Sequence, residues 1–169
     1  GDVNGSGVFT LAAPNGNTNR TLTLPDEAGT VLTTATPGAL TNLDQILHVR
    51  DEKPSGTLGG ASVAGDQVRT LNTVVSNTIS GASLASNQIT LPAGTYTVAA
   101  SAPAYLSGRH RIRLVNVTDS TVLLLGLGGY ASESAPTSTP QSLISGKFTI
   151  AGTKVLNITN STQYANSNG

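Results

Sequence analysis

The fold is decided by residues 88–128, which begin Gln-Ile-Thr-Leu-Pro-Ala-Gly-Thr-Tyr-Thr-Val (88–98) and end Leu-Leu-Leu-Gly-Leu-Gly (123–128). Apolar residues alternate with threonine on both sides of the Pro-Ala-Gly triplet at 92–94. A period of two is typical of half-buried strands. Proline presets φ and glycine tolerates positive φ, so the triplet predicts a turn. The stretch therefore predicts a meander of short strands and has almost no pattern suited to a helix.

The composition of the whole chain agrees with this local pattern. The 169 residues are rich in threonine, which suits strands, and in serine, asparagine and glycine, which suit turns. Aromatic residues make up only 4% and charged residues 11% of the chain. A core with so few large side chains is weak in a single copy, and thin folds commonly gain the missing burial by oligomerising. We therefore expect an all-β protein that self-associates.

Several classes of function are disfavoured by composition. The formal net charge is zero, which removes the case for nucleic-acid or membrane-surface binding through bulk charge. The absence of cysteine excludes disulfides, thiolate nucleophiles and cysteine-based zinc sites. No apolar run approaches transmembrane length, and the start of the chain does not resemble a secretory signal. We expect no nucleic acid, no membrane insertion and no cofactor.

The chain divides near residues 35–42 into an N-terminal segment, 1–40, and a larger domain, 41–169. The segment contains two short runs in which apolar residues alternate with threonine, each ending at a proline. It has too few large side chains to bury a core alone, so its apolar faces need partners, most simply the same segment of neighbouring chains. The alternative is a partly ordered linker.

The larger domain shows about eight strand-like runs separated by turns and two long loops. We expect strands at 46–49, 68–75, 96–104, 111–117, 121–127, 143–150 and 155–158, with at least one more within 79–91. The long loops are 54–66 and 133–141. Short strands with long loops at intervals suit a two-sheet jelly roll.

Four runs carry a family likeness: Ile89–Val98, Arg111–Val117, Gly146–Ile150 and Lys154–Ile158. Together they resemble the globular heads of complement and tumour necrosis factor proteins. Their amino-acid sequence is most similar to that of head domains at the tips of bacteriophage tail fibres. The N-terminal run Leu22–Leu32 is similar to segments that recur in phage fibre shafts.

The resemblance implies a homotrimer with a short trimeric β-stem, residues 1–40, followed by a jelly-roll β-sandwich head, residues 41–169. It implies a virion tail fibre that acts at the host-cell exterior, attaches to other tail or fibre proteins through its N-terminal segment, and binds a host-surface glycan such as lipopolysaccharide. One departure concerns the last strand. The family normally closes its jelly roll with an apolar strand, whereas this chain ends in a polar tail. Either the chain is truncated or a partner supplies that strand.

The strongest local charge feature is Arg109-His110-Arg111-Ile112-Arg113. On an extended strand the three arginines share one face, and His110 and Ile112 share the other. The planar guanidinium fork matches carboxylate and phosphate oxygens bidentately, so this face could bind acidic groups of a glycan.

The same arginines could instead pair with carboxylates across strands or subunits, and Asp66, Asp119 and Glu133 are the candidates for that role.

Four tyrosines are the remaining candidates. Tyr96 shares its face with Val98 and is expected in the core. Tyr105, Tyr130 and Tyr164 lie near loops, where a ring could stack on a sugar or simply anchor the loop. We take Tyr105 and Tyr130, with Arg109, Arg111 and Arg113, as the candidate receptor-binding residues. Loops 54–66 and 131–141 are the expected contact surfaces.

No pattern indicates an enzyme or a metal site. The two histidines, His48 and His110, have no ligand spacing. Adjacent acidic pairs at 26–27 and 51–52 point to opposite faces of an extended chain, whereas glycoside hydrolysis needs two carboxylates that face each other. We expect a receptor-binding fibre tip. The alternative is a structural fibre or decoration protein that binds another virion component; a polysaccharide-degrading spike is disfavoured.

Overall fold

The computed structural model describes residues 45–134 and 139–167. These residues form eleven strands and no helix, and every strand pair is antiparallel. The prediction of an all-β protein is confirmed. The expected stem, residues 1–40, and the expected domain boundary lie outside the described residues.

The larger of the sheets is built around the last strand of the chain. Its main path runs β4-β5-β11-β7-β8; β2 pairs with β11 beyond the end of β5, and β9 pairs with β7 beyond the end of β8. The strands are β2 (Gly65–Val68), β4 (Ser83–Ala85), β5 (Gln88–Leu91), β7 (Gly108–Asn116), β8 (Thr121–Leu125), β9 (Gly129–Ala131) and β11 (Lys154–Thr162). The predicted strands at 111–117, 121–127 and 155–158 correspond to β7, β8 and β11.

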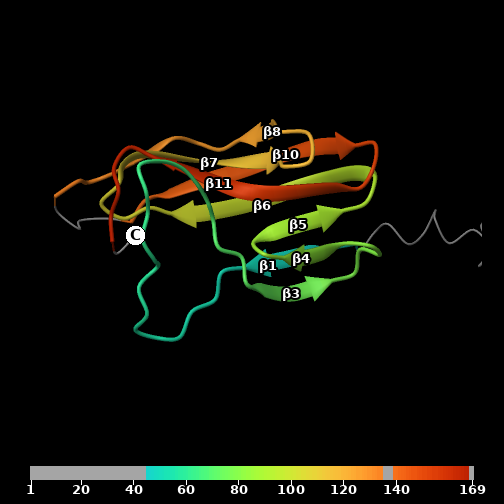
Figure 1. The fold of residues 1–169 in the computed structure, drawn as a ribbon, viewed down its shortest axis with the longest axis horizontal. Coiled ribbons are helices and arrows are strands. Elements are labelled where there is room, and N and C mark those ends of the chain that lie inside the picture. Colours follow the sequence, from blue (N-terminus) through green and yellow to red (C-terminus); the bar gives the residue numbers. More distant parts are fainter. Residues whose placement is uncertain (1–44, 135–138, 168–169) are drawn as a thin grey trace, which may run out of the picture. The chain divides into compact units, whose positions relative to one another are not determined.

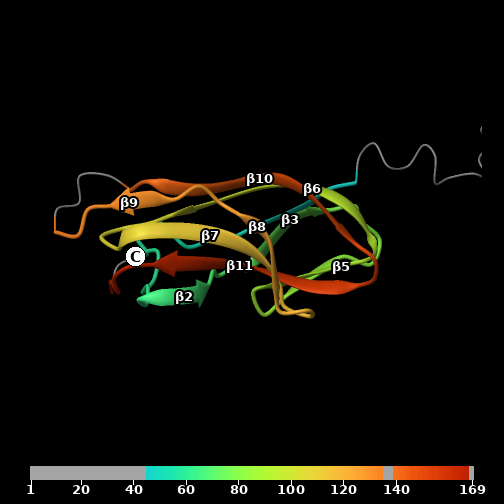
Figure 2. The same cartoon turned by 90° about the horizontal axis from the view of Figure 1, so that it is seen from above.

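Two further pairs of strands face this sheet. β10 (Gln141–Ile150) pairs with β6 (Gly94–Pro103) along its whole length, and β1 (Leu47–Arg50) pairs with β3 (Thr73–Asn77). Figure 1 and Figure 2 together place β6 and β10 in one layer and β5, β11 and β2 in the other. The described residues thus form a β-sandwich; the jelly-roll order of its strands stays a prediction.

The core lies between the layers because the two long paired strands, β6 and β10, direct alternate residues toward it. In β10, Ile144, Phe148 and Ile150 are buried, whereas Leu143 and Lys147, on the opposite face, are exposed. The core is apolar and takes residues from five strands. It comprises Leu91, Ala102, Ile112, Leu114, Ile144, Phe148, Ile150, Leu156 and Ile158.

Tyr96 packs against this core, as its parity predicts. Its ring stacks on Phe148, with ring centroids 5.5 Å apart. Its hydroxyl donates a 2.8 Å hydrogen bond to the carbonyl oxygen of Pro92, so the polar end of a half-buried ring is satisfied. Burial raises the pKa of Tyr96.

The connection between β8 and β9 joins the two layers. The Gly126 N–H donates to the Ile112 carbonyl oxygen of β7 at 2.9 Å, and the next residue, Leu127, donates to the Leu143 carbonyl oxygen of β10 at 2.8 Å. The Ser142 hydroxyl of β10 accepts a 2.9 Å hydrogen bond from the Ile112 N–H. A Cβ on Gly126 would lie 2.9 Å from the carbonyl oxygens of both Ile112 and Leu143. Glycine is therefore required where the layers meet.

The prediction of one strand over 68–75 is wrong. β2 ends at Val68 and β3 begins at Thr73. The Arg69 N–H still donates to β11, at the Ile158 carbonyl oxygen, whereas the Asn72 N–H donates to β1, at the Arg50 carbonyl oxygen. The chain crosses between sheets within these few residues, and apolar alternation carries no signal for such a crossing.

Two other regions raise the number of strands above the eight or so expected, and for residues 79–91 the result agrees with the prediction of at least one strand. Residues 79–91 hold both β4 and β5, joined by Ser86 and Asn87 with φ of 51° and 64°. Positive φ at both central residues is what a type I′ hairpin turn demands. The third additional strand is β9, so the total exceeds the expected eight.

Candidate functional site

Strand β7 presents the arginines as the sequence predicts. Arg109 and Arg111 are exposed and Arg113 is half-buried, whereas His110 and Ile112 are buried on the opposite face. Ile112 is 0% exposed and packs in the hydrophobic core, which fixes the orientation of β7. The face that carries the three arginines is therefore fixed by core packing.

The arginines line an open groove of about 680 Å³, which we call the arginine groove. β7 forms its floor, and β8, β9 and β11 supply the rest. Its residues are Arg109, His110, Arg111, Arg113, Leu125, Gly128, Gly129, Tyr130 and Ser161. Four of the five candidate residues thus lie together, although Tyr130 is seventeen or more residues from each arginine in sequence.

Arg113 is neutralised within the groove. Its guanidinium forms an ion pair with Asp66 of β2, so the alternative of pairing to a nearby carboxylate is correct for this arginine. The hydrogen bond from Arg113, followed by one from Ser161, lowers the pKa of Asp66. Of the other two carboxylates considered, Asp119 pairs with Lys154 instead.

Arg109 and Arg111 differ from Arg113. Within the described residues neither forms an ion pair. Arg111 lies beside Gly128, where a Cβ would stand 3.5 Å from its Nη2 atom. The small residue leaves the guanidinium edge open. Two unpaired guanidiniums on alternate positions of one strand face can each bind a carboxylate or phosphate group through two parallel hydrogen bonds.

Tyr130 supplies an exposed ring beside these charges. The side chain is 58% exposed, and its hydroxyl donates a 3.2 Å hydrogen bond to Oε1 of Glu133. That hydrogen bond is the main cause of the raised pKa of Tyr130, so the phenol is neutral at neutral pH. The ring face is available for stacking on a sugar ring.

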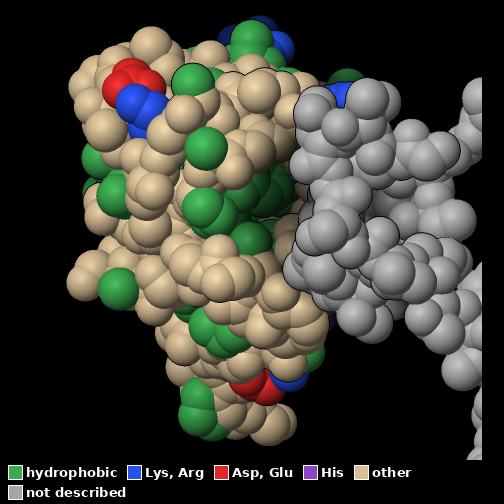
Figure 3. Space-filling view, turned by 90° about the vertical axis from the view of Figure 1, so that its right-hand side faces the viewer, with side chains coloured by type: hydrophobic (Ala, Val, Ile, Leu, Met, Phe, Trp, Pro, Cys, Tyr) green, Lys and Arg blue, Asp and Glu red, His purple; other side chains and the backbone are tan. Residues whose placement is uncertain are grey.

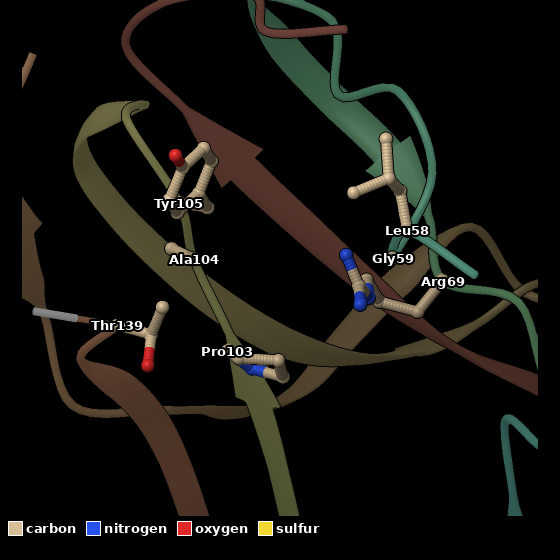
Figure 4. A pocket seen from close by; sticks show the side chains of 7 residues that line it. All are labelled: Leu58, Gly59, Arg69, Pro103, Ala104, Tyr105 and Thr139. Carbon is tan, nitrogen blue, oxygen red and sulfur yellow. The ribbon is translucent and has the colours of Figure 1, made fainter. Parts of the chain in front are cut away.

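Tyr105, the fifth candidate residue, does not line the arginine groove. It lines a separate pocket of about 380 Å³, which we call the Tyr105 pocket. Figure 4 shows its side chains, which come from Leu58, Gly59, Arg69, Pro103, Ala104, Tyr105 and Thr139. Leu58 and Gly59 lie in the loop 54–66 that was expected to be a contact surface. Arg69 was missed, because as a single basic residue after a short strand it has no motif around it.

A third hollow, of about 710 Å³, extends from the start of β1 to β6 and carries no charged side chain among its described lining residues. Figure 3 shows one end of the described domain, where hydrophobic side chains gather and few charged ones appear. The Tyr96 hydroxyl in the lining is already hydrogen-bonded to Pro92. Among its described lining residues this hollow combines apolar side chains with uncharged polar ones and offers no charged partner for an anion.

The ion pair between Arg113 and Asp66 makes the stability of the protein depend on pH. Asp66→Asn is expected to destabilise the protein at pH 6, because the carboxylate pairs with Arg113. The pKa of Asp66 is lower in the folded chain than its ordinary value of 3.8. Its contribution is therefore complete above that value and is lost as pH falls through the folded pKa. Urea unfolding should show a larger difference between wild type and variant at pH 6 than at pH 2; an equal difference at both would contradict the ion pair.

Within residues 45–134 and 139–167, no group of three or more His, Asp or Glu side chains is arranged to hold a metal ion. The same residues contain no helix with the length and apolarity to cross a membrane. Neither a protein-family model, nor a curated protein, nor a solved structure matches this chain.

Proposed function

We propose that the chain is the tip of a bacteriophage tail fibre, which trimerises and binds an acidic host-surface glycan, such as lipopolysaccharide, in the arginine groove. One observation carries the binding proposal. Arg109 and Arg111, which form no ion pair within the described residues, line an open groove together with the exposed ring of Tyr130. The assignment to a phage fibre rests on the family resemblance of the sequence.

The chemistry of the groove suits a sugar that carries negative charge. Guanidiniums recognise carboxylate and phosphate oxygens, and an aromatic face stacks on the apolar face of a sugar ring. Because the groove is open, each copy would hold its ligand weakly. Three copies in one trimer would multiply this weak binding by raising the effective concentration of the remaining sites once the first is bound.

Two exposed leucines support self-association. Leu127 and Leu143 are 67% and 46% exposed, and the Leu127 N–H donates to the Leu143 carbonyl oxygen where the β8–β9 connection meets β10. Clustered apolar side chains at a surface are typical of protein interfaces. We propose that neighbouring copies cover them.

Light scattering of the purified chain is expected to give three times the monomer mass. Leu127→Glu should reduce the mass toward that of one chain, because it places a charge in the proposed interface. Val74→Glu, on an exposed valine of β3, is the matched control and should leave the mass unchanged. A wild-type protein that is uniformly monomeric would contradict the trimer.

The leucines also favour the second candidate function, a fibre or decoration protein that binds another virion component. In that case purified particles or a partner fibre would retain the protein, whereas cells of any host would not.

Retention of fluorescently labelled protein on candidate host bacteria tests the receptor proposal. Wild type should be retained, and Arg111→Ala and Tyr130→Ala should each lower retention while the oligomer mass is unchanged. Equal retention of wild type and both variants would place the receptor site elsewhere.

A further inference from the structure

The Tyr105 pocket has the features of a separate binding site. Figure 4 shows Tyr105 and Ala104 on one side, Leu58 and Arg69 on the other, and Pro103 between them in the lower part of the view. An aromatic ring, an aliphatic side chain and a proline give the pocket apolar walls, and the guanidinium is its only charged group among the described residues. A volume of about 380 Å³ is within the range of small-molecule sites.

Arg69 indicates the charge of the ligand that the Tyr105 pocket would bind. The residue is half-buried, and within the described residues its side chain has neither an ion-pair partner nor a hydrogen-bond partner. Its backbone is fixed by the hydrogen bond from its N–H to the Ile158 carbonyl oxygen at 2.8 Å. Partial burial of a cation without a counter-charge costs free energy. An anionic group in the pocket would remove that cost.

The loop that carries Tyr105 is held in a fixed conformation. The Ala104 N–H donates to the Pro140 carbonyl oxygen at 3.0 Å, and the Ser107 carbonyl oxygen accepts from the Tyr164 N–H at 3.0 Å. Between them Leu106 has φ of 47°, a conformation that bulky residues rarely adopt. Strain of this kind persists only where the surroundings impose it, and it gathers at binding sites. The backbone that carries Tyr105 is therefore fixed on both sides of this residue before any ligand binds.

We propose that the Tyr105 pocket binds one sugar ring that carries a carboxylate, with the ring against Tyr105 and Pro103 and the carboxylate on Arg69. The inference rests on the proposed function for the saccharide class of the ligand. The β6–β7 connection leads from Tyr105 to Arg109 within four residues. An acidic polysaccharide could therefore place one residue in the Tyr105 pocket and others in the arginine groove.

Titration of the isotope-labelled full chain with glucuronate, followed by amide chemical shifts, tests the pocket. Glucuronate is expected to bind weakly and to shift the amides of Gly59 and of residues 104–107. Glucose and inorganic phosphate should each bind at least about tenfold more weakly, since each lacks either the charge or the ring. Equal binding of glucose, equal binding of phosphate, or no binding of glucuronate would overturn the proposal.

Variants separate the two sites. Arg69→Gln and Tyr105→Ala should each weaken glucuronate binding at the pocket by about tenfold, and Tyr105→Phe, which keeps the ring, should not. Arg111→Gln should leave these amide shifts unchanged. Thermal unfolding of Arg69→Gln and Tyr105→Phe checks that the domain remains folded. Glucuronate binding that is unchanged in Arg69→Gln and Tyr105→Ala would also overturn the inference.

The failure of the pocket and the failure of the proposed function give different results. If host polysaccharide binds and depends on Arg109 and Arg111 but the pocket takes no glucuronate, the inference fails and the proposed function stands. If the pocket binds glucuronate as expected but no host retains the protein, the pocket stands and the receptor function fails.

Discussion

Replacing Arg109 and Arg111 together by glutamine is expected to weaken binding to an acidic host-surface polysaccharide by about thirtyfold or more. Both guanidiniums are unpaired within the described residues and line one groove. A hydrogen bond to a charged group contributes about 1.5–3 kcal/mol. Solvent exposure in the open groove lowers this to about 1 kcal/mol for each guanidinium, about 2 kcal/mol for the two together. That free energy corresponds to about thirtyfold in affinity. Calorimetry with purified polysaccharide measures it.

The control removes the same amount of charge elsewhere. Arg50 pairs with Glu52 beside β1, and Lys147 is exposed on the outer face of β10. The Arg50→Gln, Lys147→Gln double variant should bind nearly as tightly as wild type at moderate salt. If both double variants lose affinity equally, net charge rather than the groove attracts the ligand, and the proposed site is wrong.

Gly126→Ala is expected to destabilise the fold by about 1–3 kcal/mol, the range typical of forcing an extra methyl group into a tightly packed position. The new Cβ would lie 2.9 Å from the carbonyl oxygens of Ile112 and Leu143. Both neighbours are backbone atoms of strands, which cannot rotate away as a side chain can. The strands on either side of the joint between the layers must therefore separate.

Gly152→Ala is the matched control in the β10–β11 turn. A Cβ there meets nothing within 4 Å, so the free energy of unfolding should change by less than about 0.5 kcal/mol. Urea unfolding of both variants provides the comparison. Equal stability of the Gly126 and Gly152 variants would contradict the close contact between the layers.

The long strands could be predicted from the sequence because their apolar alternation is regular. Every second residue is half-buried or buried in β6 and in β10, and the predicted ranges of these strands are close to the observed ones. The crossing between β2 and β3 could not be predicted in the same way. Its position depends on which distant strand accepts each N–H, β11 for Arg69 and β1 for Asn72. Local residue patterns do not encode that choice.

The candidate site was predictable to the extent that it lies on one strand. Strand parity is enough to place Arg109, Arg111 and Arg113 on one face, as observed. The pairing of Arg113 with Asp66 was one of several possibilities and needed the position of β2. Leu106 and Gly108, which lie between Tyr105 and Arg109, both have positive φ. These turns direct Tyr105 away from the strand face that carries the arginines, and strand parity alone does not predict them.

The most direct test compares two forms of one ligand. A phosphorylated lipopolysaccharide oligosaccharide from a bacterium that retains the protein is titrated into the wild-type chain, and the same oligosaccharide is titrated after enzymatic removal of its phosphates. If unpaired guanidiniums recognise the ligand, the phosphorylated form binds and the dephosphorylated form binds at least about tenfold more weakly. Equal affinity for the two forms would contradict anionic recognition by Arg109 and Arg111.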